Sequence, residues 1–406
     1  MQKDRNTKDD FQATELGAIP ADWRFLEFQD VMTGFSSGAT PYRGRPEYYK
    51  GDIKWITSGE LNYNIITDTF EKITEEAVSN TNLKILPKGT FLIAITGLEA
   101  EGTRGSCGVT GVEATTNQSC MALFPKVTLD NGYLYHFYVW QGKTLALKYC
   151  QGTKQQSYTG KIARTLPIIL PPTKSEQTAI ATTLSDTDGL IESLEKQISK
   201  KQNIKLGAMQ ELLTGRKRLN GFVKEWEIKM LGEVALITMG QSPKSEFYNT
   251  NGIGLPLIQG NADIENRKTI IRFFTSEITK VGELGSIIMS VRAPVGEISK
   301  AGFKCCLGRG VCAINSKNDF LYHYLIYHEK SWGKLSTGST FDSVNSAQIR
   351  SLPIKMPVDE TEQIAIALFL NEMDLEIERL EQKLTKFRMI KRGMMITLLT
   401  GKIRLS

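Results

Sequence analysis

The chain has 406 residues, 41% of them hydrophobic and 23% charged, and a formal net charge of +6. This composition is typical of a soluble protein with several globular domains. No apolar run approaches the ~18 residues of a membrane-spanning helix, and the polar N-terminus does not resemble a signal peptide, so we expect a cytoplasmic protein. The slight excess of positive charge fits an anionic partner without establishing one.

The first predicted region, residues 1–165, is a mixed α/β domain with a polar N-terminal extension. Short apolar runs rich in β-branched and aromatic residues, such as Phe91–Ile95, alternate here with loops that contain glycine. This pattern predicts several short strands rather than a helical bundle.

Residues 166–219 predict a long helix that packs along its length against a partner helix. Apolar side chains recur at alternating spacings of four and three with charged residues between them, which indicates a narrow coiled-coil seam; these positions are Ile180, Leu184, Thr187, Ile191, Leu194 and Ile198. The phase of the pattern is expected to break near Lys201–Lys205 and to resume at Leu206, Met209 and Leu213, as at a stutter. Pro171 precedes the helix, and Gly215 stands where a C-terminal cap is expected.

The same two kinds of segment then follow again. Residues 220–351 predict a second mixed domain, in which Ile287–Val291 is an apolar run of the same type. Residues 352–406 predict a second long helix, bounded by Pro357 and Gly401, with its seam at Ile366, Leu370, Met373, Ile377, Leu380, Leu384 and Phe387.

The two halves of the chain are copies of one unit. Residues 166–219 align with residues 352–405 without a gap and share 26 identities in 54 positions, against roughly three or four expected by chance. Weaker matches continue upstream, for example Trp23 with Trp226 and His136 with His323. We therefore predict an α+β fold in which two similar globular domains are separated by two long helices that pair as an antiparallel coiled coil in a pseudo-two-fold relation. The alternative is a helical hairpin buried in a core.

Residues that carry chemistry are sparse. The six cysteines show no CxxC spacing, and His136 and His323 lie in apolar-aromatic runs where a structural role is expected. The stretch Gly97–Arg104 has the glycine spacing of a phosphate-binding loop but lacks its Lys and Ser/Thr, and no methyltransferase tetrapeptide Asn-Pro-Pro-Tyr or Asp-Pro-Pro-Tyr occurs. We predict that the chain is not an enzyme and binds no metal or cofactor.

The paired motifs of the repeat resemble the specificity subunit of type I restriction–modification systems, over essentially the whole chain. The motifs are the helix tails Leu212–Leu219 and Leu398–Leu405, and the helix entries that begin with Leu166-Pro167-Ile168 and Leu352-Pro353-Ile354. The resemblance implies two target-recognition domains that each read one half of a split double-stranded DNA site, with the paired helices setting the distance between them. It also implies two methyltransferase subunits and restriction–translocation subunits as partners, and these would hold S-adenosylmethionine, ATP and Mg²⁺.

Polar loops at matched positions of the two domains are the expected DNA contacts, because a DNA-binding surface needs Arg and Lys for phosphates and Arg, Gln, Asn, Ser and Thr for base edges. In the first domain these are Arg43, Arg45, Ser58, Arg104, Gln118, Lys154, Gln155, Gln156 and Tyr158; in the second they are Lys244, Gln259, Asn261, Arg292, Arg309, Ser339, Thr340 and Asp342. For any one residue the alternative is a solvated turn. The basic end of the first helix is expected either to touch phosphate or to complement the helix dipole; its residues are Lys200, Lys201, Lys205, Arg216, Lys217 and Arg218.

Two other classes of protein remain open at this stage. One is a modification or nuclease polypeptide with its own recognition domains, which would need a nucleotide or methyl-donor site. The other is a duplicated coiled-coil scaffold with no role in nucleic-acid binding. The sequence does not reveal which DNA sequence is recognised, which base is modified, or whether a restriction subunit exists.

Overall fold

The computed structural model describes residues 11–332 and 343–405, which form two compact units. Residues up to Ser193 and from Leu384 onward belong to the first unit, and Leu194–Lys383 form the second. Each unit therefore contains one globular α/β part together with a portion of both long helices. The boundaries expected from the sequence, which set the helices apart from the globular domains, stay a prediction.

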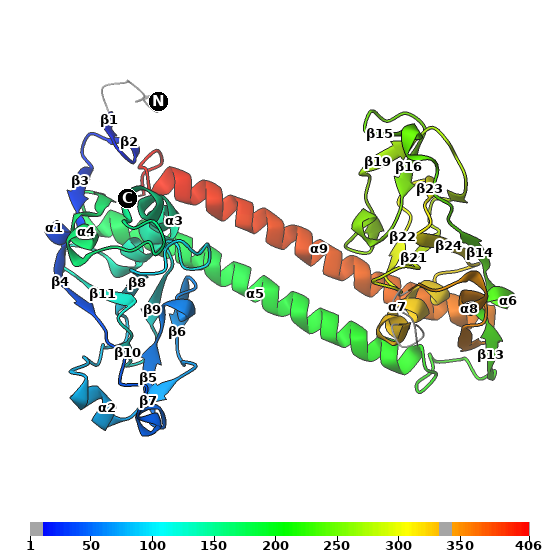
Figure 1. Cartoon of the computed structure of the whole chain (residues 1–406), viewed down its shortest axis with the longest axis horizontal. Helices are drawn as coiled ribbons and strands as arrows, with labels where there is room; N and C mark the ends of the chain where they lie inside the picture. Colours follow the sequence, from blue (N-terminus) through cyan, green and yellow to red (C-terminus); the bar gives the residue numbers. More distant parts are fainter. Residues whose placement is uncertain (1–10, 333–342, 406) are drawn as a thin grey trace. The chain divides into compact units, whose positions relative to one another are not determined.

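The globular part of the first unit is built on a five-stranded sheet of order β4-β11-β8-β9-β6, which lies beside a three-stranded sheet of order β10-β5-β7 (Figure 1). All four side chains of β8 are buried, as expected for a central strand covered on both faces. The strands are β1 (Phe11–Thr14), β2 (Gly17–Pro20), β3 (Arg24–Glu27), β4 (Met32–Ser37), β5 (Ile53–Ile56), β6 (Asn64–Ile66), β7 (Lys72–Ile73), β8 (Phe91–Ala94), β9 (Cys107–Thr110), β10 (Thr115–Thr116), β11 (Cys120–Pro125) and β12 (Pro167–Leu170). The helices are α1 (Phe28–Val31), η2 (Pro46–Tyr49), η3 (Ser58–Glu60), α2 (Glu75–Asn80), α3 (Asn131–Tyr149) and α4 (Gly160–Thr165).

The second unit repeats this plan with a six-stranded sheet of order β14-β24-β21-β22-β18-β17 and a five-stranded sheet of order β15-β19-β16-β23-β20. Its strands are β13 (Trp226–Met230), β14 (Leu236–Met239), β15 (Tyr248–Asn249), β16 (Leu255–Ile258), β17 (Ile264–Glu265), β18 (Lys268–Thr269), β19 (Phe273–Thr275), β20 (Val281–Gly282), β21 (Ile287–Ser290), β22 (Ile298–Lys300), β23 (Cys305–Leu307), β24 (Val311–Asn315) and β25 (Pro353–Pro357). Its helices are α6 (Leu231–Val234), η4 (Ser245–Phe247), η5 (Asn261–Asp263), α7 (Phe320–Trp332) and α8 (Ser346–Arg350).

The topology of the two units matches strand for strand around the sheet centre. The run β4-β11-β8-β9 corresponds to β14-β24-β21-β22, with antiparallel pairing throughout. Strand β5 pairs in parallel with β10, and β16 pairs in parallel with β23. In each unit a further pair of antiparallel strands lies outside these sheets. Strand β3 pairs with β12, which precedes α5, and β13 pairs with β25, which precedes α9. The predicted pair of similar mixed domains is thereby confirmed.

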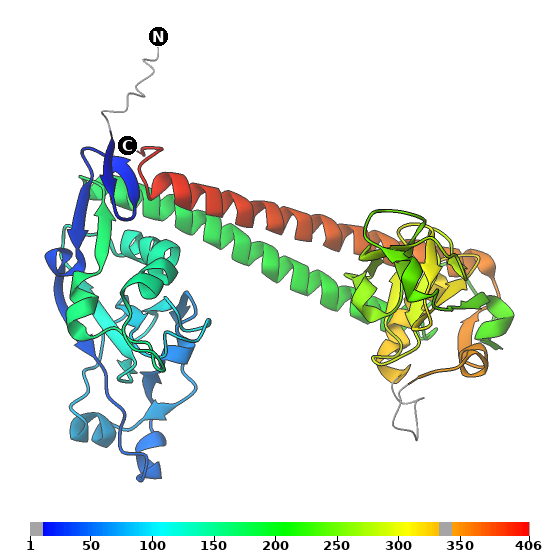
Figure 2. The ribbon, with the colours of Figure 1, turned by 45° about the horizontal axis from the view of Figure 1, so that its top comes forward.

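The long helices α5 (Lys174–Leu212) and α9 (Glu360–Leu398) have 39 residues each and pack antiparallel within each unit (Figure 2). In the second unit Lys201 pairs with Glu376 at 2.7 Å, and Lys205 pairs with Asp374 further toward the start of α9. In the first unit Asp188 pairs with Lys391 at 2.5 Å. In each case the residue number falls along α9 as it rises along α5, as antiparallel helices require. The predicted helix pairing is confirmed, and the buried helical hairpin is excluded by the exposed outer faces of both helices.

The predicted seam is correct except for its break. Ile180, Leu184, Leu194, Ile198, Ile366, Leu370, Ile377 and Leu384 are buried, whereas Ile191, Met373 and Leu380 are half-buried. Of the three positions at which the pattern is expected to resume, Met209 and Leu213 are buried, whereas Leu206 is 59% exposed and lies outside the seam. The four-and-three spacing also continues through Lys201 and Lys205 to Leu212, which is buried. Lys205 stands in the seam with its side chain 14% exposed and paired to Asp374. Because a lysine interrupts the apolar pattern at this point, the sequence places Leu206 in the seam where the structure places Lys205.

A second polar position in the seam repeats the first. Lys391 is 186 positions after Lys205, Asp374 is 186 positions after Asp188, and the Lys391–Asp188 pair has a lysine side chain 18% exposed. Each unit therefore has a lysine–aspartate pair in the helix seam. The two pairs occupy equivalent positions of the repeat, with the lysine on α5 in one unit and on α9 in the other. Such polar positions cost stability but favour one register, since any slip would leave a half-buried charge without its partner.

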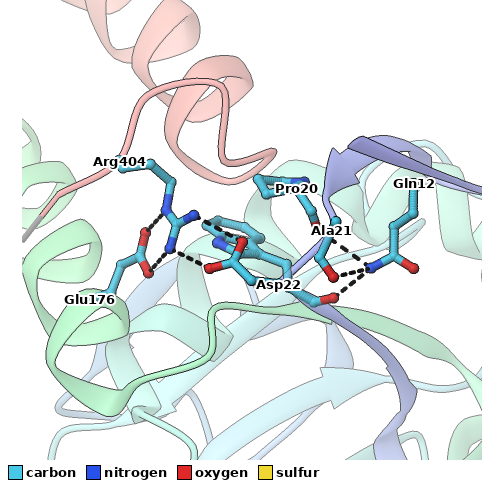
Figure 3. A network of polar contacts seen from close by, with 7 residues as sticks. Gln12, Pro20, Ala21, Asp22, Glu176 and Arg404 are labelled. Atoms are coloured by element: carbon cyan, nitrogen blue, oxygen red, sulfur yellow. Dashed lines mark hydrogen bonds and ion pairs between the residues drawn. The ribbon is translucent and has the colours of Figure 1, made fainter. Parts of the chain in front are cut away.

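The tail after each long helix forms an ion pair with the first turn of the other long helix, and we call these the tail ion pairs. Arg404 donates to Glu176 Oε1 at 2.5 Å and Oε2 at 2.9 Å, and also to both oxygens of Asp22 at 3.0 Å (Figure 3). In the second unit Arg218 binds both oxygens of Glu362, whose side chain is fully buried. The carboxylates raise the pKa of Arg404 and of Arg218. Three of the basic residues at the end of α5 therefore form ion pairs with residues of α9, namely Lys201, Lys205 and Arg218. This role differs from both roles expected from the sequence, which were contact with phosphate and compensation of the helix dipole.

The glycine of each tail is needed for its close packing. Gly215 and Gly401 have φ of +72° and +68°, the left-handed region that favours glycine. A Cβ at Gly401 would lie 2.5 Å from Pro20 and 3.0 Å from the indole of Trp23, and one at Gly215 would lie 3.3 Å from Trp226. The guanidinium groups of Arg404 and Arg218 stand 5.7 Å and 5.9 Å from the ring centres of the same two tryptophans. The repeated Thr-Gly and the repeated Trp therefore belong to one packing motif.

The two equivalent histidines connect the globular parts to the long helices. His136 on α3 lies 2.9 Å from the Ser185 hydroxyl of α5, and His323 on α7 lies 2.9 Å from the Asn371 side-chain oxygen of α9. Burial lowers the pKa of each imidazole to about 4, so both are neutral at physiological pH. These contacts support the structural role expected from the sequence.

Candidate nucleic-acid interface

Polar loops from distant parts of the first unit converge where its central strands end. The backbone N–H of Ala39 donates to the Thr116 carbonyl at 3.1 Å, and that of Asn117 donates to the Ile56 carbonyl at 2.9 Å. The N–H of Ile95 donates to the Ser119 carbonyl at 2.9 Å. Four loops thereby meet, and the N–H of Tyr158 adds a fifth by donating to the Ile95 carbonyl at 2.8 Å.

The second unit forms the same set of contacts with different residues. Gln241 N donates to the Leu307 carbonyl at 2.8 Å, and Gly308 N to the Ile258 carbonyl at 2.8 Å. Val291 N donates to the Gly310 carbonyl at 2.8 Å, and Val344 N donates to the Val291 carbonyl at 3.0 Å. We call this shared set of backbone contacts the loop lattice.

In both units a carboxylate hydrogen bond and a close approach of the backbone at a glycine accompany the loop lattice. The N–H of Thr57 is held by the Glu60 carboxylate at 2.8 Å, and the N–H of Gln259 by the Asp263 carboxylate at 2.7 Å. A Cβ on Gly38 would lie 1.8 Å from the Thr116 carbonyl oxygen, and one on Gly240 would lie 2.1 Å from that of Gly308. These distances explain why glycine recurs at both positions: the two backbones approach too closely for any side chain.

The predicted residues of the first unit lie in three different environments. Lys154 and Gln155 are exposed, and Gln118 is exposed with its side-chain oxygen accepting from the Thr40 hydroxyl. Ser58 and Gln156 are half-buried, and Tyr158 is buried in the core with 3% of its surface exposed. Arg104 is half-buried and positions its own loop, since it donates to the Leu98 carbonyl at 2.8 Å and the Glu99 carbonyl at 2.6 Å.

Arg43 and Arg45 lie on the segment around η2 and are held by neighbours within the protein. Arg43 makes a bidentate pair with Glu71 at 2.6 and 2.8 Å, and it stacks 4.2 Å from the ring centre of Tyr49. This pair raises the pKa of Arg43 and lowers that of Glu71. Arg45 donates to the Tyr48 hydroxyl at 2.8 Å. A DNA phosphate would have to compete with these partners.

In the second unit the predicted arginines are less constrained. Arg309 and Arg292 are exposed, and among the described residues neither guanidinium has a hydrogen-bond or ion-pair partner. The backbone N–H of Arg309 donates to the Ser242 hydroxyl at 3.1 Å, which fixes the loop and leaves the side chain outside. Asn261 and Lys244 are exposed, Lys244 being 3.8 Å from Glu246, and Gln259 is half-buried. Ser339, Thr340 and Asp342 lie outside the described residues.

One position of the loop lattice, Thr96, is not among the DNA contacts expected from the sequence. Thr96 forms an isolated β-bridge with Ser157, as Arg292 does with Ser343. A sequence signal existed, because Thr96 follows the buried run Phe91–Ile95 as Arg292 follows Ile287–Val291. A single threonine after an apolar strand has no chemistry that distinguishes a DNA contact from a structural residue.

The described residues hold no group of three or more His, Cys, Asp or Glu able to bind a metal ion. The six cysteines are free, and burial raises the pKa of Cys305 to about 11 and that of Cys312 to about 12. No helix in residues 11–332 and 343–405 is long and apolar enough to span a membrane. The loop lattice, rather than any cluster of reactive groups, is therefore the candidate site.

Comparisons with known proteins agree with each other. The family model for the "Type I restriction modification DNA specificity domain" matches residues 20–203 and again residues 223–386. The chain is 30% identical to a Methanocaldococcus jannaschii protein named "Putative type I restriction enzyme MjaX specificity subunit", over 98% of this chain and 97% of that protein. Its fold is similar to the crystal structure of the type I restriction–modification S subunit from M. genitalium, with a TM-score of 0.65 and 18% identity over 93% of this chain and 96% of the other. A chain from a structural study of the assembly of a type I restriction–modification system is also similar, with a TM-score of 0.59 and 20% identity over 95% of this chain and 99% of the other.

Proposed function

The chain belongs to the family of type I restriction–modification DNA specificity subunits, and from this premise we propose that its two units each read one half of a bipartite double-stranded DNA site. As a specificity subunit it is non-catalytic and contains two target-recognition domains. The observation that carries the proposal is the loop lattice, which is the same in both units and presents different side chains in each. A shared scaffold with different exposed groups suits two half-sites of different sequence.

The chemistry of the loops fits the grooves of DNA. Amide, hydroxyl and guanidinium groups can hydrogen-bond base edges in the major groove, and lysines such as Lys154 can neutralise phosphates. The exposed side chains around each loop lattice supply these groups, among them Gln118 and Gln155 in the first unit and Arg292 and Arg309 in the second. We propose that these loops, rather than the long helices, contact the bases.

We also propose that the paired helices set the spacing of the half-sites and bind the partner subunits in the cytoplasm. Half-sites read from one face of DNA lie about 34–36 Å apart per helical turn, and a 39-residue helix is about 58 Å long. The expected partners are two methyltransferase subunits and restriction–translocation subunits. S-adenosylmethionine, ATP and Mg²⁺ would be bound by those subunits and not by this chain.

The stoichiometry of the methyltransferase complex tests the partner proposal. Because α5 and α9 are two copies of one helix and carry equivalent tail ion pairs, we expect two equivalent binding surfaces and therefore two methyltransferase subunits for each chain. Native mass spectrometry of the reconstituted complex measures this directly. A complex that stays at one to one with excess methyltransferase present would contradict the proposal.

A binding profile on a randomised duplex library tests the reading of two half-sites. The wild-type chain, with its methyltransferase, should enrich a motif of two short blocks separated by a spacer. Changing Gln155 and Gln156 together to Ala should relax discrimination in one block only, by about 1–3 kcal/mol for each lost bidentate base contact. Arg309→Ala should affect the other block or, if Arg309 contacts phosphate, weaken all sequences equally and reduce the salt dependence by about one ion.

Two outcomes would count against the proposal. If the Gln155 and Gln156 variant alters both blocks, or alters neither while binding stays intact, that loop does not read bases. If the wild-type chain retards no duplex, alone or with its methyltransferase, the chain is a scaffold and the proposal of DNA reading fails.

A further inference from the structure

The loop lattice defines which side chains of the two units occupy equivalent places. Because the same backbone hydrogen bonds recur, a residue next to a given contact in one unit corresponds to the residue next to that contact in the other. The number of residues that separates equivalent positions changes from loop to loop, so no single offset in the sequence gives the correspondence. The equivalent pairs are Thr40 with Ser242, Thr57 with Gln259, Thr96 with Arg292, Gln118 with Arg309, and Ser157 with Ser343.

In one of these pairs, Gln118 and Arg309, both side chains are long and exposed but differ in hydrogen-bonding chemistry. Gln118 lies between Asn117, whose N–H donates to Ile56, and Ser119, whose carbonyl accepts from Ile95. Arg309 lies in the same way between Gly308 and Gly310, which contact Ile258 and Val291. The backbone of other loops holds both neighbours in each unit, and the side chain between them is exposed and differs between the two units.

The hydroxyl beside each of these residues positions it without using up its donors. The Thr40 hydroxyl donates to the Gln118 side-chain oxygen, which keeps one free lone pair and the amide NH₂ group. Ser242 accepts from the backbone N–H of Arg309, so the guanidinium keeps its donors, with no partner among the described residues. A glutamine that can donate and accept matches the N7 and N6 edge of adenine, and an arginine fork matches the N7 and O6 edge of guanine.

We propose that Gln118 and Arg309 are the matched specificity-determining residues of the two units, with Gln118 reading an adenine in one half-site and Arg309 a guanine in the other. This inference rests on the proposed function, because it presupposes that the loop lattice faces the bases. It goes further because it assigns one base to each unit. It also implies that exchanging the residue types at positions 118 and 309 exchanges the bases that are read.

Reciprocal substitution tests the assignment on the full chain with its methyltransferase, using the randomised duplex library. Gln118→Arg should change one position of one block from adenine to guanine, and Arg309→Gln should change one position of the other block from guanine to adenine. A good bidentate contact discriminates by 1–3 kcal/mol, so each switch should be about 5- to 150-fold in relative enrichment. The rest of each motif and the spacer should stay as in the wild type.

Matched variants separate base reading from a change of charge. Gln29→Arg adds the same charge to the exposed surface of α1, and Lys317→Gln removes one from the second unit at a side chain that is 81% exposed; both should leave the motif unchanged. Because Gln118 and Arg309 are exposed, all four variants should unfold at the wild-type temperature. A wild-type bipartite motif that neither reciprocal variant alters, or an Arg309→Gln variant that weakens all sequences equally, would overturn this inference alone. The lack of any motif with the wild-type chain would overturn the proposed function as well.

Discussion

Changing Arg218 to Ala should destabilise the second unit by about 3 kcal/mol, because it leaves the Glu362 carboxylate buried without its counter-charge. Glu362 has no exposed side-chain surface, and both of its oxygens accept from Arg218. The Arg218 side chain is itself 26% exposed, so water can reach part of the site, and we expect the lower end of the range for broken buried pairs. Urea denaturation, together with hydrogen exchange of the amides in β13 and β25, measures the effect.

Two further variants identify the cause of this loss. Lys217→Ala removes a charge from the adjacent residue, whose side chain is 77% exposed, and should change stability by less than about 0.5 kcal/mol. Replacing both partners, Arg218→Met with Glu362→Leu, should restore much of the stability, since no unpaired charge is then buried. Equal unfolding midpoints for Arg218→Ala and Lys217→Ala would show that the tail ion pair contributes nothing.

Leu194→Asp should cost at least about 3 kcal/mol, because it removes a buried apolar side chain and places an unpaired carboxylate in the helix seam. Leu194 is 3% exposed. The matched control is Leu206→Asp on the same helix, where the side chain is 59% exposed and the same substitution should be nearly neutral. Thermal and chemical unfolding of the isolated chain distinguishes the two variants.

The comparison also tests the register of the coiled coil. A stutter after Ile198 would place Leu206 in the seam, and the two aspartate variants would then be similarly unstable. The continuous four-and-three spacing instead places Lys205 there, paired with Asp374. Similar losses in both variants would therefore contradict the seam described above.

The candidate interface was predictable only in part, and particular residues show why. Gln118, Gln155, Gln259, Arg292 and Arg309 are expected to contact DNA because polar, amide-rich loops recur at matched places in the repeat, and the structure brings these loops together around the strand ends. Tyr158 is expected to contact DNA for the same reason, yet it is buried. Its backbone N–H donates to the Ile95 carbonyl and its side chain lies in the core, whereas Lys154 and Gln155 of the same loop are exposed.

Periodicity and repetition along the chain determined the two similar domains, the two long helices, most of the seam and the family. These features depend on residues within a few turns of each other or on a gapless alignment, so the sequence carries them directly. The tertiary structure alone decided that Lys205 continues the seam, that Arg404 binds Glu176 across 228 positions, and that five loops share one lattice. Those contacts join residues far apart in the chain, and their energy comes from burial and charge pairing, which exist only once the segments have come together.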